Sequence, residues 1–195
     1  KGISAAKITV LPNGVDTEKL SPLKRTKSLV EQYQLEDSIV LGFVGSITNY
    51  EGIDLIIDTV QALNNRDEYS KRFKLLVVGD GQYRATLQRK VLDQNLSEDV
   101  IFTGKVPFET VQDYYSVIDI APFPRQDKLV CQLVTPIKTY EAMAMSKRVI
   151  VSDVNALKEM VIDQVNGVYF KADDREALTE AVISVPAYFN NARRK

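Results

Sequence analysis

Histidine is absent from this chain, and cysteine occurs only once, as Cys131, in 195 residues. Without histidine, serine–histidine and cysteine–histidine nucleophilic systems are excluded, as is any histidine-ligated zinc site. A single cysteine excludes both an internal disulfide and a cysteine metal cluster. The carboxylates show no pair with recognisable metal-ligand spacing. The sequence therefore predicts a site that works without a metal ion or a cofactor.

Long apolar runs and a strong charge bias are also missing. No run approaches the ~20 residues that span a bilayer, and no signal peptide opens the chain. The formal net charge of -1 disfavours a nucleic-acid-binding module, which usually carries a basic face. These absences indicate a cytoplasmic domain. Because no Met precedes Lys1, we expect the chain to be a piece of a longer protein.

What the sequence does contain is a regular alternation of β-branched runs and helical stretches. We expect strands at residues 8–11, 39–45, 73–78, 100–102, 118–121, 149–151 and 168–170. We expect helices at residues 53–63, 108–117, 135–145, 156–161 and 175–185, and one more through Leu87, Val91 and Leu92. This alternation predicts an α/β fold with a doubly wound parallel sheet. Residues 1–185 would form one Rossmann-like domain, and residues 186–195 a loosely packed tail.

The segment at residues 134–145 predicts an anion site at a helix start. Thr135 can cap the helix, and Pro136 suits its first position, where no backbone N–H is missed. The free N–H groups of the first turn attract phosphate, and Lys138 adds a full positive charge. Glu141 follows three residues later, so both side chains can face the same side. On this segment alone, an ordinary capped helix with a solvated Lys138 and Glu141 is the alternative interpretation.

Glycines and polar residues gather where the expected strands end. Because the carboxyl ends of parallel strands share one edge, ligands of such folds bind there. The strand-end candidates are Asn13-Gly14, Gly45-Ser46, Gly79-Asp80-Gly81, Thr103-Gly104-Lys105, Pro124-Arg125 and Thr135-Pro136. Neither G-x-G-x-x-G nor the P-loop pattern is present. The helix start at Thr135 is therefore the expected phosphate site.

Four segments, in order, resemble the carboxy-terminal, donor-binding half of retaining GT-B glycosyltransferases of family 4, also called group 1. They are Val10-Leu11-Pro12-Asn13-Gly14-Val15-Asp16, Phe43-Val44-Gly45-Ser46 with Tyr50-Glu51-Gly52-Ile53-Asp54, Val77-Val78-Gly79-Asp80-Gly81, and Val134-Thr135-Pro136-Ile137-Lys138 with Glu141-Ala142-Met143-Ala144-Met145. Matches run from about Thr9 to Ala181, so the resemblance covers almost the whole chain. It implies one of two Rossmann-like halves, with a nucleotide-diphosphate sugar bound between them.

The resemblance implies a role for each matching residue. Lys138 and Arg125 are the expected catalytic residues, because they would stabilise the departing diphosphate, and this retaining chemistry is thought to need no enzyme nucleophile. Glu141 matches the second Glu of the family's Glu-x7-Glu motif, which meets the ribose hydroxyls. The loop Thr103-Gly104-Lys105-Val106 would flank the base. The expected donor-binding residues are Gly45, Ser46, Thr103, Gly104, Lys105, Val106, Lys128, Gln132, Thr135, Pro136, Ile137 and Glu141.

Three positions depart from the family pattern. Ser46 stands where the family commonly has Arg, and Glu51 where it commonly has Lys. Glu51 would repel a phosphate if it pointed inward, and Arg125 and Lys128 are the expected replacement cations. The position of the motif's first Glu is apolar here, so its neighbour Gln132 is the candidate contact with the donor sugar.

The resemblance predicts the donor-binding half of a hexosyl-type glycosyltransferase that transfers a sugar from a nucleotide-diphosphate sugar to an acceptor hydroxyl, with retention. An amino-terminal domain absent from this chain would hold the acceptor, so the chain alone would be inactive. Family acceptors include lipid-linked and polysaccharide intermediates, which implies polysaccharide biosynthesis at the inner face of a membrane. Two alternatives stay open: a catalytically inert nucleotide-binding module serving a partner subunit, and a nucleotide-sugar epimerase of the same fold.

Overall fold

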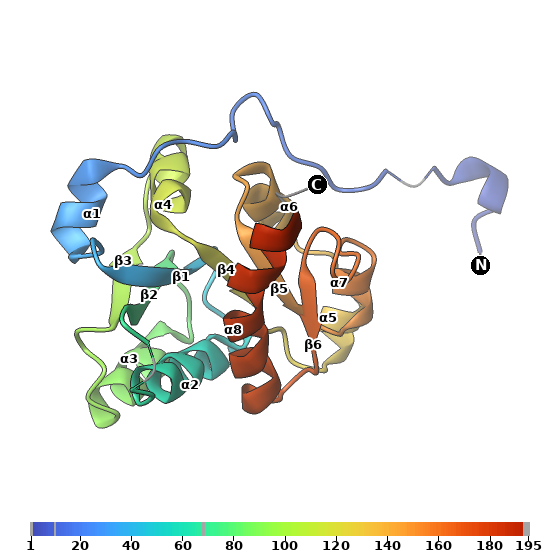
Figure 1. Cartoon of the computed structure of the whole chain (residues 1–195). Coiled ribbons are helices and arrows are strands. Elements are labelled where there is room, and N and C mark those ends of the chain that lie inside the picture. The colour runs from blue at the N-terminus through green and yellow to red at the C-terminus, as the bar shows by residue number, and fades with distance from the viewer. Residues whose placement is uncertain (1, 10, 68, 193–195) are drawn as a thin grey trace.

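In the described part of the chain, six parallel strands form one central sheet (Figure 1). The computed structural model describes residues 2–9, 11–67 and 69–192, without the side chains of Ala5 and of residues 186–192. The strand order β3-β2-β1-β4-β5-β6 is that of a doubly wound Rossmann-like fold, so the predicted fold class is confirmed. The strands are β1 Ser38–Val44, β2 Arg72–Val78, β3 Val100–Gly104, β4 Ile120–Phe123, β5 Arg148–Ser152 and β6 Val168–Phe170.

Helices cover both faces of this sheet (Figure 1). The α-helices are α1 Lys27–Tyr33, α2 Ile53–Asn64, α3 Arg84–Asp93, α4 Val111–Val117, α5 Leu129–Leu133, α6 Ile137–Ala144, α7 Asn155–Lys158 and α8 Arg175–Ala192. Short 3-10 turns are η1 Ala5–Lys7, η2 Asn49–Glu51 and η3 Phe108–Thr110. The sequence pattern did not predict α1 and α5, and it merged η3 and α4 into one helix.

Each face of the sheet has its own apolar cluster. On one face, α2, α3 and α8 pack against Leu41 and Phe43 of β1. On the other face, α1, α4, α6 and α7 pack against Val40 and Val44 of the same strand. Because successive side chains of a strand point to opposite faces, a nearly continuous apolar run such as β1 is what two covered faces require.

The strand expected at residues 8–11 was wrong. Ile8, Thr9 and Leu11 lie outside any strand, and Val10 lies outside the described residues. Ile8 and Leu11 are 56% and 84% exposed, so neither side chain is held in the core. A β-branched run forms a strand only where a neighbour pairs with its backbone, and this arm runs away from the sheet (Figure 1).

Two boundaries also differ from the expected ones. Pro122, where the expected strand was to end, lies inside β4 and pairs with Ile150 of β5. Pairing of β4 with β1 is confined to Ile120 and Leu41, as expected beside a proline that has no N–H to donate. The last helix continues to Ala192 instead of ending at residue 185. The predicted loose packing of residues 186–195 stays a prediction, because their side chains lie outside the described ones.

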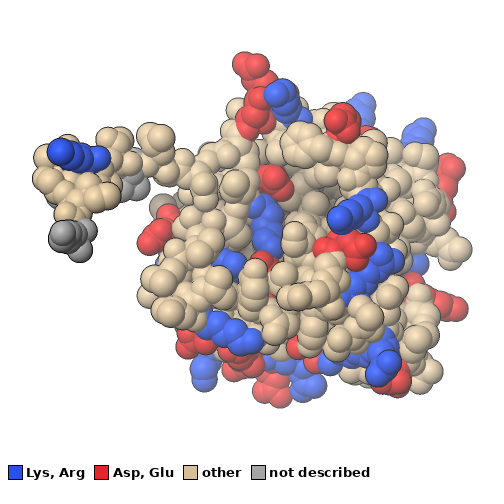
Figure 2. Space-filling view, turned by 180° about the vertical axis from the view of Figure 1, so that it is seen from behind, with Lys and Arg blue, Asp and Glu red and all other residues tan. Residues whose placement is uncertain are grey.

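Charges of both signs are mixed over one face of the molecule. On the face that Figure 2 shows, basic and acidic side chains are interspersed and no large patch of one sign forms. This mixture agrees with the net charge of -1. Every helix among the described residues is too short or too polar to pass through a lipid bilayer.

Candidate functional site

A cavity of about 370 Å³ lies at the point where the strand order of the sheet reverses. β1 and β4 are neighbours, but the chain continues from β1 to β2 on one side and from β4 to β5 on the other. The connections that leave the carboxyl ends of β1 and β4 therefore diverge. Ligands of open parallel sheets bind in the crevice between such connections. The cavity is lined by Val44, Gly45, Ser46, Glu51, Phe108, Val111, Arg125, Pro136, Ile137, Lys138 and Glu141.

The helix start at the cavity differs from the predicted one by one residue. Pro136 has an extended backbone (ψ 126°) and is the N-cap of α6, so Ile137 is the first helical residue. The predicted cap by Thr135 was wrong, because α6 has no side-chain cap hydrogen bond. Thr135 is instead contacted from the amino-terminal arm, where Asn13 Nδ2 donates to its carbonyl oxygen at 3.2 Å. Pro136 and the first helical residues, Ile137 and Lys138, line the cavity. Anion binding at this helix N-terminus stays a prediction.

Lys138 extends from the first turn of α6 into a largely buried position. Its side chain is 14% exposed, and Nζ lies 2.7 Å from Glu51 Oε2. The ammonium also lies 4.6 Å from the ring centroid of Phe43, at a distance suited to a cation–π contact. Burial lowers the pKa of Lys138, while the carboxylate of Glu51 acts in the opposite direction. A Cβ on Gly45 would lie 3.6 Å from Lys138 Cδ, an ordinary contact distance, so glycine is favoured there by its positive φ of 143°.

Arg125 follows β4 and is almost completely buried. The residue is 3% exposed, and NH1 donates to the carbonyl oxygen of Val134 at 2.6 Å. NH2 lies 3.6 Å from Glu51 Oε1, and the guanidinium lies 5.7 Å from the ring centroid of Tyr50. Two cations, one on α6 and one on the loop after β4, thus meet at one carboxylate. We call Lys138, Arg125 and Glu51 the Lys138 cluster.

Glu51 does point inward, as the sequence allowed, but it is paired. The residue is 4% exposed and ends η2, directly after the loop that leaves β1. Sequence reasoning treated Glu51 as a possible repulsive charge and missed its role as the shared partner of both cations. The sequence did offer a signal: Glu51 follows β1 and lies near the same edge of the sheet as Lys138 and Arg125, so an ion pair could have been expected.

Glu141 lies one turn beyond Lys138 and lines the same cavity, so the prediction that both side chains face one side is confirmed. Tyr115 of α4 donates a hydrogen bond from its hydroxyl to Glu141 Oε2 at 3.1 Å. Tyr115 is 1% exposed, and burial, together with the nearby carboxylate, raises its pKa well above 10. The phenol thus fixes one carboxylate oxygen while the other can accept hydroxyl donors.

The other predicted donor-binding residues divide into two groups. Gly45, Ser46, Pro136 and Ile137 line the cavity. The predicted base loop, Thr103 to Val106, begins in β3, which stands two strands from β1, and contributes no lining residue. Its turn depends on Gly104, which has a positive φ of 76°.

Lys128 and Gln132 lie in the α5 region and do not line the cavity either. Lys128 is exposed. The Gln132 amide is held at both ends, because Nε2 donates to Asp127 at 2.6 Å and Oε1 accepts from the Asn155 backbone N–H at 2.8 Å. Contact of either residue with a sugar or phosphate stays a prediction.

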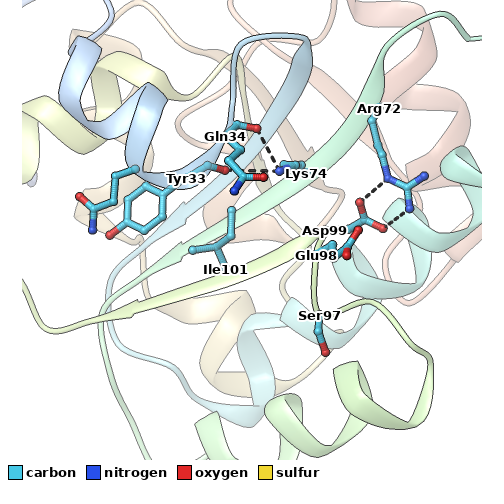
Figure 3. A pocket seen from close by; sticks show the side chains of 9 residues that line it. Tyr33, Gln34, Arg72, Lys74, Ser97, Glu98, Asp99 and Ile101 are labelled. Atoms are coloured by element: carbon cyan, nitrogen blue, oxygen red, sulfur yellow. Dashed lines mark hydrogen bonds and ion pairs between the residues drawn. The ribbon is translucent and has the colours of Figure 1, made fainter.

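A second polar pocket, of about 440 Å³, lies at the opposite, amino edge of the strands (Figure 3). Arg72 donates to both oxygens of Asp99 at 2.6 and 2.7 Å. Lys74 donates to the carbonyl oxygens of Tyr33 and Gln34 at the end of α1, at 3.3 and 3.0 Å. We call it the amino-edge pocket; its cations are engaged in joining α1, β2 and the start of β3.

Among the described residues, no group of three or more Cys, Asp or Glu side chains is arranged to hold a metal ion. In the cavity, Glu51 is paired with Lys138 and Arg125, and Glu141 accepts from Tyr115. The predicted absence of a metal and cofactor stays a prediction.

Comparison with known proteins identifies relatives that are about twice as long. A GDP-mannose-dependent alpha-(1-6)-phosphatidylinositol monomannoside mannosyltransferase of Mycolicibacterium smegmatis is 29% identical over 184 residues, 93% of this chain and 47% of that protein. A lipopolysaccharide 1,2-N-acetylglucosaminetransferase of Salmonella typhimurium is 30% identical over 177 residues, 85% of this chain and 43% of that protein. The chain thus spans less than half the length of these curated relatives.

Solved structures share the fold. The C-terminal domain of the group 1 glycosyl transferase LpcC from Francisella tularensis has a TM-score of 0.71 at 19% identity, covering 89% of this chain and 88% of that chain. Anabaena HepE in complex with UDP and glucose has a TM-score of 0.75 at 18% identity, covering 90% and 46%. The family model described as Glycosyl transferases group 1 matches residues 38–186. With its six-stranded Rossmann-like sheet, the chain belongs to the group 1 glycosyltransferases of GT-B fold.

Proposed function

We propose that this chain is the donor-binding half of a retaining glycosyltransferase, which transfers a hexosyl-type sugar from a nucleotide-diphosphate sugar to an acceptor hydroxyl. The observation that carries the proposal is the Lys138 cluster beside the N-terminus of α6. Two buried cations and a helix N-terminus converge on one cavity, an arrangement suited to a diphosphate. Family membership and the names of the curated relatives support sugar transfer.

In this proposal, Lys138 and Arg125 stabilise the negative charge that develops on the departing diphosphate. Preorganised cations in a site shielded from water are effective because they need little rearrangement during the reaction. Ser46 and the backbone at Gly45 and Ile137 would surround the phosphates. Glu141, oriented by its bond from a tyrosine, would accept hydrogen bonds from the ribose.

The remaining predicted contacts belong to the base and the sugar. The loop at residues 103–106 would flank the base, as predicted, although none of its residues lines the cavity. Lys128 and Gln132 would approach the sugar from the α5 side. HepE, a structural neighbour, was solved with UDP and with UDP-glucose, which makes a uridine nucleotide one donor to test.

The full activity requires more than this chain in our proposal. An amino-terminal acceptor domain would complete the cleft, and no metal ion or cofactor would take part. The curated relatives named above are a phosphatidylinositol mannoside enzyme and a lipopolysaccharide enzyme. By analogy, we propose an acceptor presented at the cytoplasmic face of a membrane, in polysaccharide or glycolipid synthesis.

One observation favours the alternative of an inert nucleotide-binding module. Glu51 occupies both cations, and Ser46 supplies no charge where the family commonly has Arg. A module of this kind would bind nucleotide but support no transfer in the longer protein.

Calorimetric titration with UDP, GDP and ADP tests the proposal. We expect one nucleotide to bind saturably, and Lys138→Ala to weaken that binding by about a hundredfold, because a desolvated phosphate contact is lost. Lys71→Ala is the matched control, since Lys71 is exposed and precedes β2 at the opposite edge of the sheet. Equal affinity of Lys138→Ala and wild type would contradict the proposed site. Binding without sugar transfer by the longer protein would favour the inert module.

A further inference from the structure

Glu51 is the residue of the cavity that a diphosphate site does not require. A carboxylate near bound phosphate reduces the attraction between the phosphate and the surrounding cations. Yet Glu51 is buried, its side chain is 6% exposed, and both of its oxygens face cations: Oε2 at 2.7 Å from Lys138 and Oε1 at 3.6 Å from Arg125. A structural turn fixes it there, because Gly52 follows with a positive φ of 73° against the backbone of Pro124.

The two cations need such a partner. The side chains of Lys138 and Arg125 are 14% and 4% exposed, so both charges lie mostly out of water. A buried ammonium without a counter-charge tends to lose its proton, and a flexible lysine stem lets it move away. Glu51 lies against both groups, so it can keep Lys138 charged and hold both side chains in place.

We propose that Glu51 is a positioning residue of the diphosphate site: its carboxylate keeps the ammonium of Lys138 charged and directs this ammonium and the guanidinium of Arg125 toward the cavity. This inference rests on the proposed function, because it takes a diphosphate as the anion. Within the Lys138 cluster two positive charges share one negative charge, and the other carboxylate of the cavity, Glu141, is bonded to Tyr115.

The charged groups facing Lys138 come from three elements. Glu51 belongs to η2, Arg125 follows β4, and Glu141 lies on α6 itself. Of these, Glu51 does most to raise the pKa of Lys138 against the lowering by burial, whereas Arg125 lowers it and Glu141 raises it less. Glu141 is already bonded to Tyr115. Removing the charge at position 51 should therefore change the pKa of Lys138 more than removing the charge of Arg125 or Glu141.

NMR titration of Lys138 Nζ tests the inference without any nucleotide. We expect the titration point to fall by at least about one pH unit in Glu51→Gln, because the neutral amide no longer stabilises the ammonium. Glu51→Asp, which keeps the charge, should recover part of that change. Glu36→Gln is the matched control, since Glu36 is exposed before β1. If Lys138 titrates as in wild type in Glu51→Gln, the inference is wrong.

Nucleotide affinity gives the second measurement. Across about pH 7 to pH 10, we expect Glu51→Gln to lose affinity for the bound nucleoside diphosphate at a lower pH than wild type, with at least a roughly tenfold loss near pH 9. Affinity equal to or above that of wild type at every pH would overturn the inference and make Glu51 a purely repulsive charge. If wild type binds none of UDP, GDP and ADP, the proposed function fails, and the Lys138 titration alone decides the role of Glu51.

Discussion

The two edges of the sheet use the same kinds of charged side chain in different ways. At the amino edge, Arg72 bonds both oxygens of Asp99 and Lys74 bonds two backbone carbonyls (Figure 3). At the carboxyl edge, Lys138 and Arg125 share one carboxylate. Each cation of the amino edge has its own acceptors, whereas the two cations of the carboxyl edge share the carboxylate of Glu51.

Exposure separates the two edges as well. The Arg72 side chain is 57% exposed, but the side chains of Lys138 and Arg125 are 14% and 4% exposed. Exposed cations cost little because water solvates them, while buried cations are retained only with partners. Burying two cations against one carboxylate is not expected to stabilise the fold, because desolvation of the charges can cost more than their attraction returns. The comparison therefore supports a structural role for the amino-edge pocket and the proposed diphosphate role for the Lys138 cluster.

The largest expected effect comes from breaking the turn that places Glu51. A Cβ on Gly52 would lie 1.9 Å from the carbonyl oxygen of Pro124, and φ is 73°. We expect Gly52→Ala to lower the free energy of unfolding by about 4 kcal/mol, from steric overlap and left-handed strain together. Urea denaturation measures the change. Gly14→Ala is the matched control, because a Cβ on Gly14 meets nothing within 4 Å; equal effects of the two variants would contradict the role of the turn.

The next effect compares the cations of the two edges. We expect Arg125→Met to lower the free energy of unfolding by about 3 kcal/mol, because the Val134 carbonyl and Glu51 lose a buried charged donor. Lys74→Met should cost only about 1 kcal/mol, since the carbonyls it leaves can be reached by water. Urea denaturation of both variants checks the difference. Equal losses of stability in the two variants would contradict the difference between the edges. Nucleotide affinity should fall in Arg125→Met and not in Lys74→Met.

The smallest effect is a pH dependence of stability. Because burial lowers the pKa of Lys138 below 10.5, the unfolded chain binds more protons than the folded chain between the folded-state pKa and 10.5. Lys138 therefore costs stability at neutral pH, and this cost decreases as the pH rises toward 10.5, by less than about 1.4 kcal/mol per pH unit. The free energy of unfolding of wild type minus that of Lys138→Met should thus rise with pH. Lys71→Met is the matched lysine control, since Lys71 is exposed.

Local patterns predicted much of the molecule. The apolar runs of β1 and β2 marked strands covered on both faces, and helix periodicity placed α2. Such patterns work because burial repeats with the period of the element. The pattern failed at residues 8–11, where β-branched residues lack a neighbouring strand, and at Pro122, where pairing with β5 carries the strand through a proline.

The residues of the cavity could also be nominated from sequence, but their partners could not. Lys138, Arg125 and Glu141 were expected there, and all three line it. Thr135 was expected to cap α6, yet the extended backbone of Pro136 moves the start of the helix by one residue. The bonds of Gln132 to Asp127 and Asn155 join segments whose meeting depends on how α5 and α7 pack.

The sequence by itself determined the alternation of strands and helices, the family, and the strand-end positions that carry charge. These follow from local periodicity and from residue types at fixed spacing, which need no knowledge of long-range contacts. Only the tertiary structure decided that Glu51, 87 residues before Lys138, lies 2.7 Å from it. The strength of an ion pair depends on distance and on the exclusion of water. Both are fixed only when segments far apart in the sequence meet at one edge of the sheet.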